Sequence, residues 1–113
     1  MSKVVSLADE RIYLFALEGN LKEVRKHIIG GGNVLASHPI HNGDTALHAA
    51  CANGHLDVCK YLCSVGANEH HGNDKGNVPL HYAVKNGHLK IVTHLIYRTS
   101  ESANARNKYG TTA

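Results

Sequence analysis

Apolar residues recur at helical spacing in two matched pairs of stripes. Residues 47–51 place leucine, alanine and cysteine on one helical face, and residues 58–63 place valine, leucine and two cysteines on another. The same two stripes return 33 residues later, at 80–84 and 91–96. One glycine separates the stripes of each pair, where a chain reversal needs a residue that tolerates a positive φ. The pattern predicts two units, each a short helix, a tight reversal and a second helix.

The two units also match residue by residue. Residues 43–62, GDTALHAACANGHLDVCKYL, and residues 76–95, GNVPLHYAVKNGHLKIVTHL, are identical at nine of twenty positions. Aliphatic residues replace all three cysteines in the second copy, as expected of buried thiols that pack as small hydrophobes. These replacements are Val84 for Cys51, Val92 for Cys59 and Ile96 for Cys63. A repeat of this period predicts stacked units, each of which buries its faces against its neighbours.

Both units resemble ankyrin repeats. The resemblance rests on the turn glycine, the TALH and VPLH boxes, the small residues that follow them and the Gly-His reversal. Residues 12–29, IYLFALEGNLKEVRKHII, resemble the family's N-terminal repeat, and residues 101–113, ESANARNKYGTTA, resemble the approach to another repeat with Gly110 at its turn. The resemblance implies an all-α ankyrin-repeat solenoid of helix-turn-helix pairs with β-hairpin-like finger loops, about three repeats plus the start of a fourth.

We expect one ankyrin repeat domain over residues 1–113. Its predicted divisions are an N-terminal repeat at 6–40, full repeats at 41–73 and 74–106, and the start of a truncated repeat at 107–113. The motif stops at Ala113 before a Leu-His pair and a helix, so we expect the sequence to be a fragment of a longer array or multidomain chain.

Local signals place several helix ends. Ser6-Leu7-Ala8-Asp9 is a capping-box sequence for the first helix, and Thr45 is placed to cap the next inner helix. Pro79 fits the first position of the following inner helix, while Val78 offers that helix no hydroxyl cap. We expect a loop at Arg98–Glu101.

Composition narrows the class of protein. The chain of 113 residues is 42% hydrophobic with a net charge of +3, which is typical of a globular domain. No signal-like or membrane-length apolar stretch is present, so we expect an intracellular protein in the cytoplasm or nucleus, with reduced thiols and no membrane partner. Nucleic-acid binding is disfavoured, because the pI of about 8.8 is modest and no aromatic stacking platform accompanies the basic residues.

Histidine and cysteine raise the question of a metal site. The resemblance implies that His48 and His81 are structural hydrogen-bonding residues, and that His55 and His88 tie each reversal loop to the backbone. Cys59 and Cys63 are spaced like two ligands on one helix, but their apolar stripe favours core packing.

The other histidines give no stronger signal. The pair His70-His71 could bind metal adventitiously, although a solvated or partner-contacting loop is favoured, and the same interpretation applies to His38 and His41. His27 and His94 lie on outer helices without a site-like context. We therefore predict no metal site and no cofactor.

Catalysis also lacks a sequence signature. The glycines at 30–32 are not followed by the Gly-Lys-Ser/Thr ending of a phosphate loop. The leading prediction is a non-catalytic protein-protein interaction module, not an enzyme. The alternative is the N-terminal regulatory or substrate-recruiting segment of a larger enzyme or channel.

In ankyrin arrays, partners bind the concave face formed by the finger tips and inner helices. The matching positions here are His41, Asn42, Asp44, Ala52, Asn53, Asp74, Lys75, Asn77, Lys85, Asn86, Arg106, Lys108 and Tyr109. Six basic against two acidic residues give residues 72–113 a charge of +4, which suggests a weak preference for an acidic segment of a protein or peptide partner. We expect a monomer unless the uncapped C-terminal end self-associates.

Overall fold

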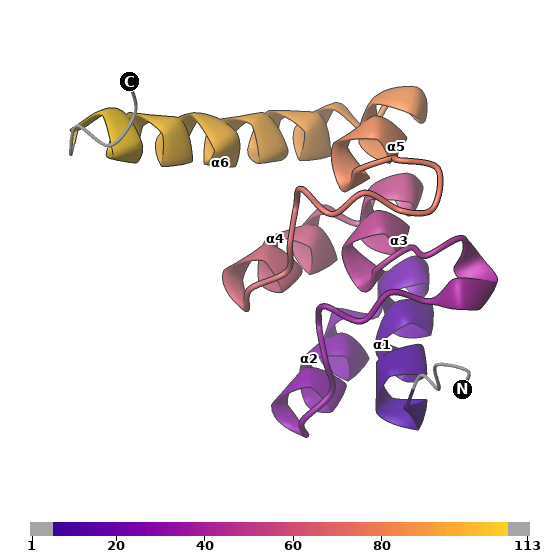
Figure 1. Cartoon of the computed structure of the whole chain (residues 1–113). Coiled ribbons are helices and arrows are strands. Elements are labelled where there is room, and N and C mark those ends of the chain that lie inside the picture. The colour runs from indigo at the N-terminus through magenta and orange to yellow at the C-terminus, as the bar shows by residue number, and fades with distance from the viewer. Residues whose placement is uncertain (1–5, 109–113) are drawn as a thin grey trace.

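Residues 6–108 are described by the computed structural model, which forms three stacked helix pairs (Figure 1). The helices are α1 (Leu7–Glu18), α2 (Leu21–Ile29), α3 (Ala46–Asn53), α4 (Leu56–Ser64), α5 (Pro79–Lys85) and α6 (Leu89–Lys108). The inner helices α1, α3 and α5 pack in sequence on one side, and the outer helices α2, α4 and α6 on the other. Within that range there is no strand, so the predicted all-α solenoid is confirmed. None of these helices is long and apolar enough to cross a membrane.

Helix ends follow the predicted signals. Ser6 Oγ accepts the amide of Asp9 at 3.1 Å and caps α1. Thr45 caps α3 in a reciprocal arrangement, because His48 Nδ1 accepts the Thr45 amide at 3.0 Å while Thr45 Oγ1 accepts the His48 amide at 3.5 Å. Val78 lacks a side-chain oxygen, and α5 keeps only the half of this box in which His81 Nδ1 accepts the Val78 amide at 3.0 Å.

The hydrophobic core is formed by the residues of the repeated apolar stripes. Ile12, Leu47 and Leu62 are among its largest fully buried side chains, and all three cysteines are buried as free thiols. The prediction that the thiols pack as small hydrophobes is therefore confirmed. Val84, the counterpart of Cys51, is 59% exposed, because within residues 6–99 no further repeat covers the outer surface of α5.

Each reversal loop is bonded to the helix pair before it. The side chains of Asn53 and His55 both donate to the carbonyl of Leu17, at 2.8 and 3.0 Å. One repeat later, Asn86 and His88 donate to the carbonyl of Ala52, at 2.9 and 3.0 Å. A carbonyl oxygen can only accept, so Nε2 carries the proton in both histidines. This confirms the scaffold role predicted for His55 and His88.

The finger loops form a second line of joints. His48 Nε2 lies 2.8 Å from the carbonyl of Asn77 in the next finger, which confirms the structural role predicted for His48. The Asp74 amide donates to the carbonyl of Asn42 at 2.9 Å, so one finger tip is bonded to the next. The first finger is not a regular hairpin, because residues 39–41 form a 3₁₀ turn beside an isolated bridge from His38 to Asp44.

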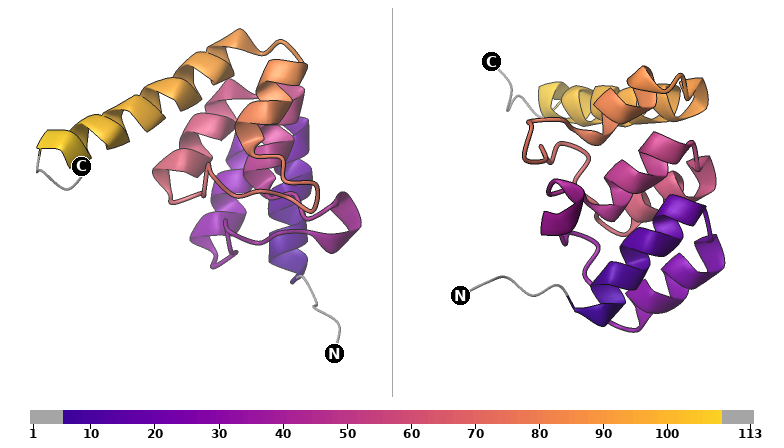
Figure 2. Two further views of the ribbon diagram at one scale, coloured as in Figure 1. Left: turned by 45° about the horizontal axis from the view of Figure 1, so that its top comes forward. Right: turned by 90° about the vertical axis from the view of Figure 1, so that its right-hand side faces the viewer.

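The prediction of a loop at Arg98–Glu101 is wrong, since α6 continues through this segment to Lys108. Residues 98–108 contain no glycine or proline, and alanine, glutamate, arginine and lysine favour a helix. The last turns of α6 extend away from the other helices in Figure 1 and in the left view of Figure 2. The predicted repeat start at 107–113 lies mostly outside the described residues, and its first two residues are helical.

The reversal glycines offer a test of the joints. Gly54 has a φ of +78°, and a Cβ there would lie 2.7 Å from the ring of His88. Gly87 has almost the same φ, +74°, but nothing lies within 4 Å of its Cβ position. We expect Gly87→Ala to lower the free energy of unfolding by about 1–2 kcal/mol, the cost of a left-handed alanine. Gly54→Ala should cost clearly more, because it also displaces His88.

Urea unfolding of the two variants and the parent protein measures the difference. The matched φ angles cancel the backbone cost, so the excess loss in Gly54→Ala reports the contact with His88. Equal losses in the two variants would show that the joint does not resist this displacement.

Candidate functional site

The predicted partner-binding positions lie on the finger loops and on the inner helices, which together we call the concave face. Its parts are residues 38–44, residues 73–77 and the helices α1, α3 and α5. Figure 1 shows the finger loops projecting beside one end of the inner helices, on the side away from α2, α4 and α6. Of the predicted positions, those that are exposed are Asn42, Asn53, Asp74, Lys75, Lys85 and Asn86, and those that are half-buried are His41, Ala52 and Asn77.

Asp44 is not presented to a partner, contrary to the prediction. Its side chain is buried and accepts hydrogen bonds from Asn73 Nδ2 at 2.8 Å and from the Tyr82 hydroxyl at 3.1 Å. Asn73 in turn accepts the amides of Lys75 and Asn77 through Oδ1, at 2.9 and 3.0 Å. Asp44 therefore fixes the base of the second finger, and its charge is used within the scaffold.

The two predicted asparagines of the inner helices are also engaged. Asn53 and Asn86 are exposed, yet their amide groups donate to the preceding repeat in the joints described above. A partner would have to share these groups with the scaffold. Lys75 and Lys85 carry no such bond through their side chains within the described residues, and the same holds for the exposed Asn42 and Asp74.

Two apolar side chains on this face were missed by the sequence analysis. Ile40, in the 3₁₀ turn of the first finger, is 82% exposed. Leu14, 42% exposed, occupies the helical register of Ala49 and Tyr82 in the later repeats. The finger containing Ile40 is two residues longer than the next. This difference in length is the sequence signal that could have identified Ile40.

Arg106 and Lys108 do not lie on a third finger as predicted. Arg106 and Lys108 lie in the last turns of α6 rather than on a finger tip, because the helix continues where a loop was expected. Tyr109 lies outside the described residues. Of the predicted basic positions, Lys75 and Lys85 remain on the described concave face, with Asp74 next to the first of them.

Burial controls the protonation of the histidines that hold the fingers. Burial lowers the pKa of His48, against the opposing effect of its bond to the Asn77 carbonyl. Burial likewise lowers the pKa of His38, whose ring lies beside Tyr13, with ring centres 4.8 Å apart. Tyr13 stacks on His41, with ring centres 4.2 Å apart, and burial followed by the charge of Asp44 raises the pKa of Tyr13 to about 12. The rings of His38, His48 and Tyr13 therefore act as neutral packing groups near pH 7.

One cluster of metal-ligating chemistry occurs among the described residues, away from the concave face. The sulfurs of Cys59 and Cys63 and a ring nitrogen of His94 all lie within 4.8 Å of one another. The prediction that His94 lacks a site-like context is therefore wrong. Burial lowers the pKa of His94, with the charges of Arg98 and Lys60 adding to the effect, so the imidazole is neutral at pH 7.

The thiols themselves are poor nucleophiles. The hydrogen bond to Cys51 is the largest cause that raises the pKa of Cys59, and the hydrogen bond to Cys59 followed by burial raises the pKa of Cys63. Thiolate, rather than thiol, is the nucleophile in cysteine catalysis. Neither residue is therefore poised for covalent chemistry, and the described surface suits binding better than catalysis.

The comparison with known families agrees with the geometry. A family model described as ankyrin repeats, in three copies, matches residues 12–112, which is most of the chain.

Removing the Asp44 carboxylate should destabilise the scaffold. Asp44→Ala leaves the hydroxyl of Tyr82 without its acceptor and removes one of the two acceptors of the Asn73 amide, which keeps the Tyr82 oxygen. Unsatisfied buried groups cost about 1–3 kcal/mol each, so we expect the free energy of unfolding to fall by about 2 kcal/mol. Tyr82→Phe removes one donor to Asp44 and one acceptor of the Asn73 amide, but the bond between Asn73 and Asp44 remains, so it should cost less, about 1 kcal/mol. Chemical denaturation measures both, and an unchanged stability in Asp44→Ala would contradict this role.

The buried histidines predict acid sensitivity. Because burial lowers the pKa values of His38 and His48, the unfolded chain takes up protons below about pH 6.5 while the folded chain does not. The free energy of unfolding should therefore fall as the pH drops through about 6.5, with the loss complete only below the folded pKa values.

Urea unfolding at about pH 7.5 and about pH 5.5 tests this dependence. The exposed His70 provides the control, because His70→Gln should leave the pH dependence unchanged while His38→Leu should weaken it. A stability that is the same at both pH values would show that the buried rings do not titrate differently on unfolding.

Proposed function

The chain belongs to the ankyrin repeat family, and from this we propose that it is a non-catalytic module that binds a protein or peptide partner on its concave face. Ankyrin repeats are generally protein-protein interaction modules and are typically non-catalytic. The observation that carries the proposal is that some side chains are bonded within the scaffold, whereas others are exposed to solvent without such a bond. The boxes and reversals are engaged within the scaffold, whereas the side chains of Ile40, Lys75 and Lys85 extend into solvent.

The exposed set has the composition of a recognition surface. An apolar side chain that is exposed in the free protein gains by being buried in an interface, and a few such anchors usually carry much of the binding energy. Ile40 stands on a finger that is fixed at both ends, because the amides of His41 and Gly43 both donate to the carbonyl of His38. A rigid support of this kind lowers the entropy lost on binding.

Charge adds a weak preference for an acidic segment of the partner. Lys75 lies on the second finger and Lys85 at the end of α5, and both are exposed. Asp74 offsets part of this charge, whereas Asp44 is buried against its hydrogen-bond donors. Electrostatic complementarity of this size chooses among partners more than it adds affinity.

Selection of peptides from a random displayed library against the whole chain tests the proposal directly. We expect the enriched peptides to combine acidic and apolar residues. The double variant Lys75→Glu, Lys85→Glu should lose about tenfold or more in affinity for them, because it places like charges opposite each other. Ile40→Ala should weaken binding as well, by removing the apolar anchor.

The matched control is Lys22→Glu, Lys26→Glu, which makes the same charge change on the exposed surface of the outer helix α2. This control should bind like the parent protein, and thermal unfolding should show that both double variants remain folded. Equal loss of binding in both double variants, or no loss in either, would contradict the concave face as the binding surface.

A further inference from the structure

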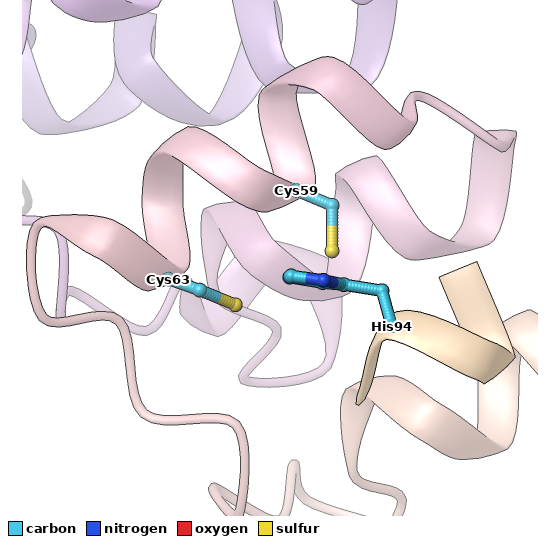
Figure 3. Close-up of side chains that lie close together, drawn as sticks. All are labelled: Cys59, Cys63 and His94. Atoms are coloured by element: carbon cyan, nitrogen blue, oxygen red, sulfur yellow. The ribbon is translucent and has the colours of Figure 1, made fainter. Parts of the chain in front are cut away.

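Two thiols and one imidazole meet between the outer helices of the second and third repeats. Cys59 and Cys63 come from successive turns of α4, and His94 comes from α6 (Figure 3). Figure 3 shows the ring of His94 directed from α6 toward both sulfurs. Their three ligand atoms lie within 4.8 Å of one another. We propose that these three residues bind one Zn²⁺ ion, which links α4 to α6.

The repeat pattern does not account for this cluster. Stacking of ankyrin units requires an apolar stripe on the outer helix, and the third repeat builds it from Val92 and Ile96 at the positions of Cys59 and Cys63. The second repeat carries Tyr61 at the position of His94, and the ring of Tyr61 lies under Arg25 instead. The two thiols and the imidazole therefore meet at one junction between the described repeats. Stacking alone does not require cysteine or histidine at these three positions.

The imidazole is unsatisfied as it stands. His94 Nε2 is shielded from solvent and has no hydrogen-bond partner among the described residues. A buried polar atom without a partner costs free energy, and such an atom in a native protein calls for an explanation. Its neighbours are two buried thiols rather than a better acceptor or donor. A metal ion in the middle of the three groups would satisfy the nitrogen.

The donor set selects zinc among the common divalent ions. Thiolate and imidazole are the ligands that Zn²⁺ prefers, whereas Mg²⁺ and Ca²⁺ take oxygen. Tetrahedral coordination with Zn–S of about 2.3 Å and Zn–N of about 2.0 Å separates the ligand atoms by about 3.5–3.8 Å. The three groups therefore need to approach one another by only about 1 Å.

Charge balance also suits a buried site. Binding of Zn²⁺ displaces the protons of both thiols to solvent, and two thiolates, one neutral imidazole and the ion sum to zero charge. A neutral cluster avoids the large cost of an isolated charge in an apolar interior. The fourth position remains for water or an external ligand. Cys51 lies 3.9 Å from Cys59, sulfur to sulfur, but it is not part of the three-residue cluster.

The site borders an open groove on its imidazole side. An open groove runs along the outer surface between α4 and α6, and His94 forms part of its lining together with Lys60, Lys90 and Tyr97. Solvent therefore reaches the side of the imidazole without any helix having to separate.

Zinc analysis of the whole chain tests the proposal. The protein is prepared without a polyhistidine tag, kept reduced, loaded with Zn²⁺, freed of excess metal and measured by plasma mass spectrometry. We expect about one Zn²⁺ per chain. Cys59→Val and Cys63→Ile substitute the residues that the third repeat carries at the same positions, so the stripe stays apolar. Each should lower the zinc content or affinity by at least ~10-fold, as should His94→Gln.

Matched controls separate this site from adventitious binding. Cys51→Val also borrows the third repeat's residue, and it should keep its zinc, as should His70→Gln at the exposed His70. A content far below one ion per chain would overturn the proposal. Zinc that persists in Cys59→Val and Cys63→Ile, or that is lost in Cys51→Val, would overturn the assignment to these three residues.

A second readout does not depend on the folding of any variant. Co²⁺ bound by thiolates shows sulfur-to-metal charge-transfer absorption, and tetrahedral coordination gives intense visible bands. Both features should appear when Co²⁺ is added to the reduced parent protein and vanish on addition of Zn²⁺. Their absence from the parent protein would contradict the proposed ligands.

Zinc should also raise the unfolding temperature of the parent protein but not that of Cys63→Ile.

Discussion

The stacking of this protein depends on a hydrogen-bonded joint in which two side chains of one repeat share a backbone carbonyl of the repeat before it. The carbonyls of Leu17 and Ala52 lie near the ends of inner helices, where no helical amide satisfies them. An asparagine and a histidine from the next reversal supply the missing donors. Each repeat thereby completes the helix end of its predecessor, and the predecessor's own reversal glycine provides the space that the histidine ring needs, Gly19 for His55 and Gly54 for His88.

Features of the structure that depend on residues close together in the chain could be predicted from the sequence. Helix starts at Ser6 and Thr45 depend on neighbouring residues, so they appear in the chain as local signals. The buried cysteines were predictable because the second copy replaces each with an aliphatic residue. The helical course of residues 98–108 could also have been recognised from their composition, but the expected repeat boundary outweighed that local evidence.

Other features depend on groups that are distant in sequence. Asp44 looks like a solvent-exposed turn residue until the second finger brings Asn73 and Tyr82 to its carboxylate. His94 looks isolated until α6 packs beside α4 and places its ring near two thiols. Neither meeting has a signature in the spacing of residues along one unit. Comparison of the two copies reveals what both share, whereas these contacts differ between repeats and require the packed structure.

The joints also give the array a direction. In the joints at the reversals, the acceptor carbonyl belongs to the earlier repeat and the side-chain donors to the later one. The first repeat breaks this rule, because its reversal carries Glu18 and Asn20 around Gly19 in place of asparagine and histidine. The Glu18 carboxylate cannot donate, so the amide nitrogen of Asn20, whose oxygen accepts the amide of Glu23, is the one side-chain donor of that pair. If two copies met end to end, Glu18 of one would face the acceptor carbonyl of Lys85 in the other. The same joint that adds each repeat to its predecessor therefore disfavours head-to-tail growth of separate chains into an open-ended filament.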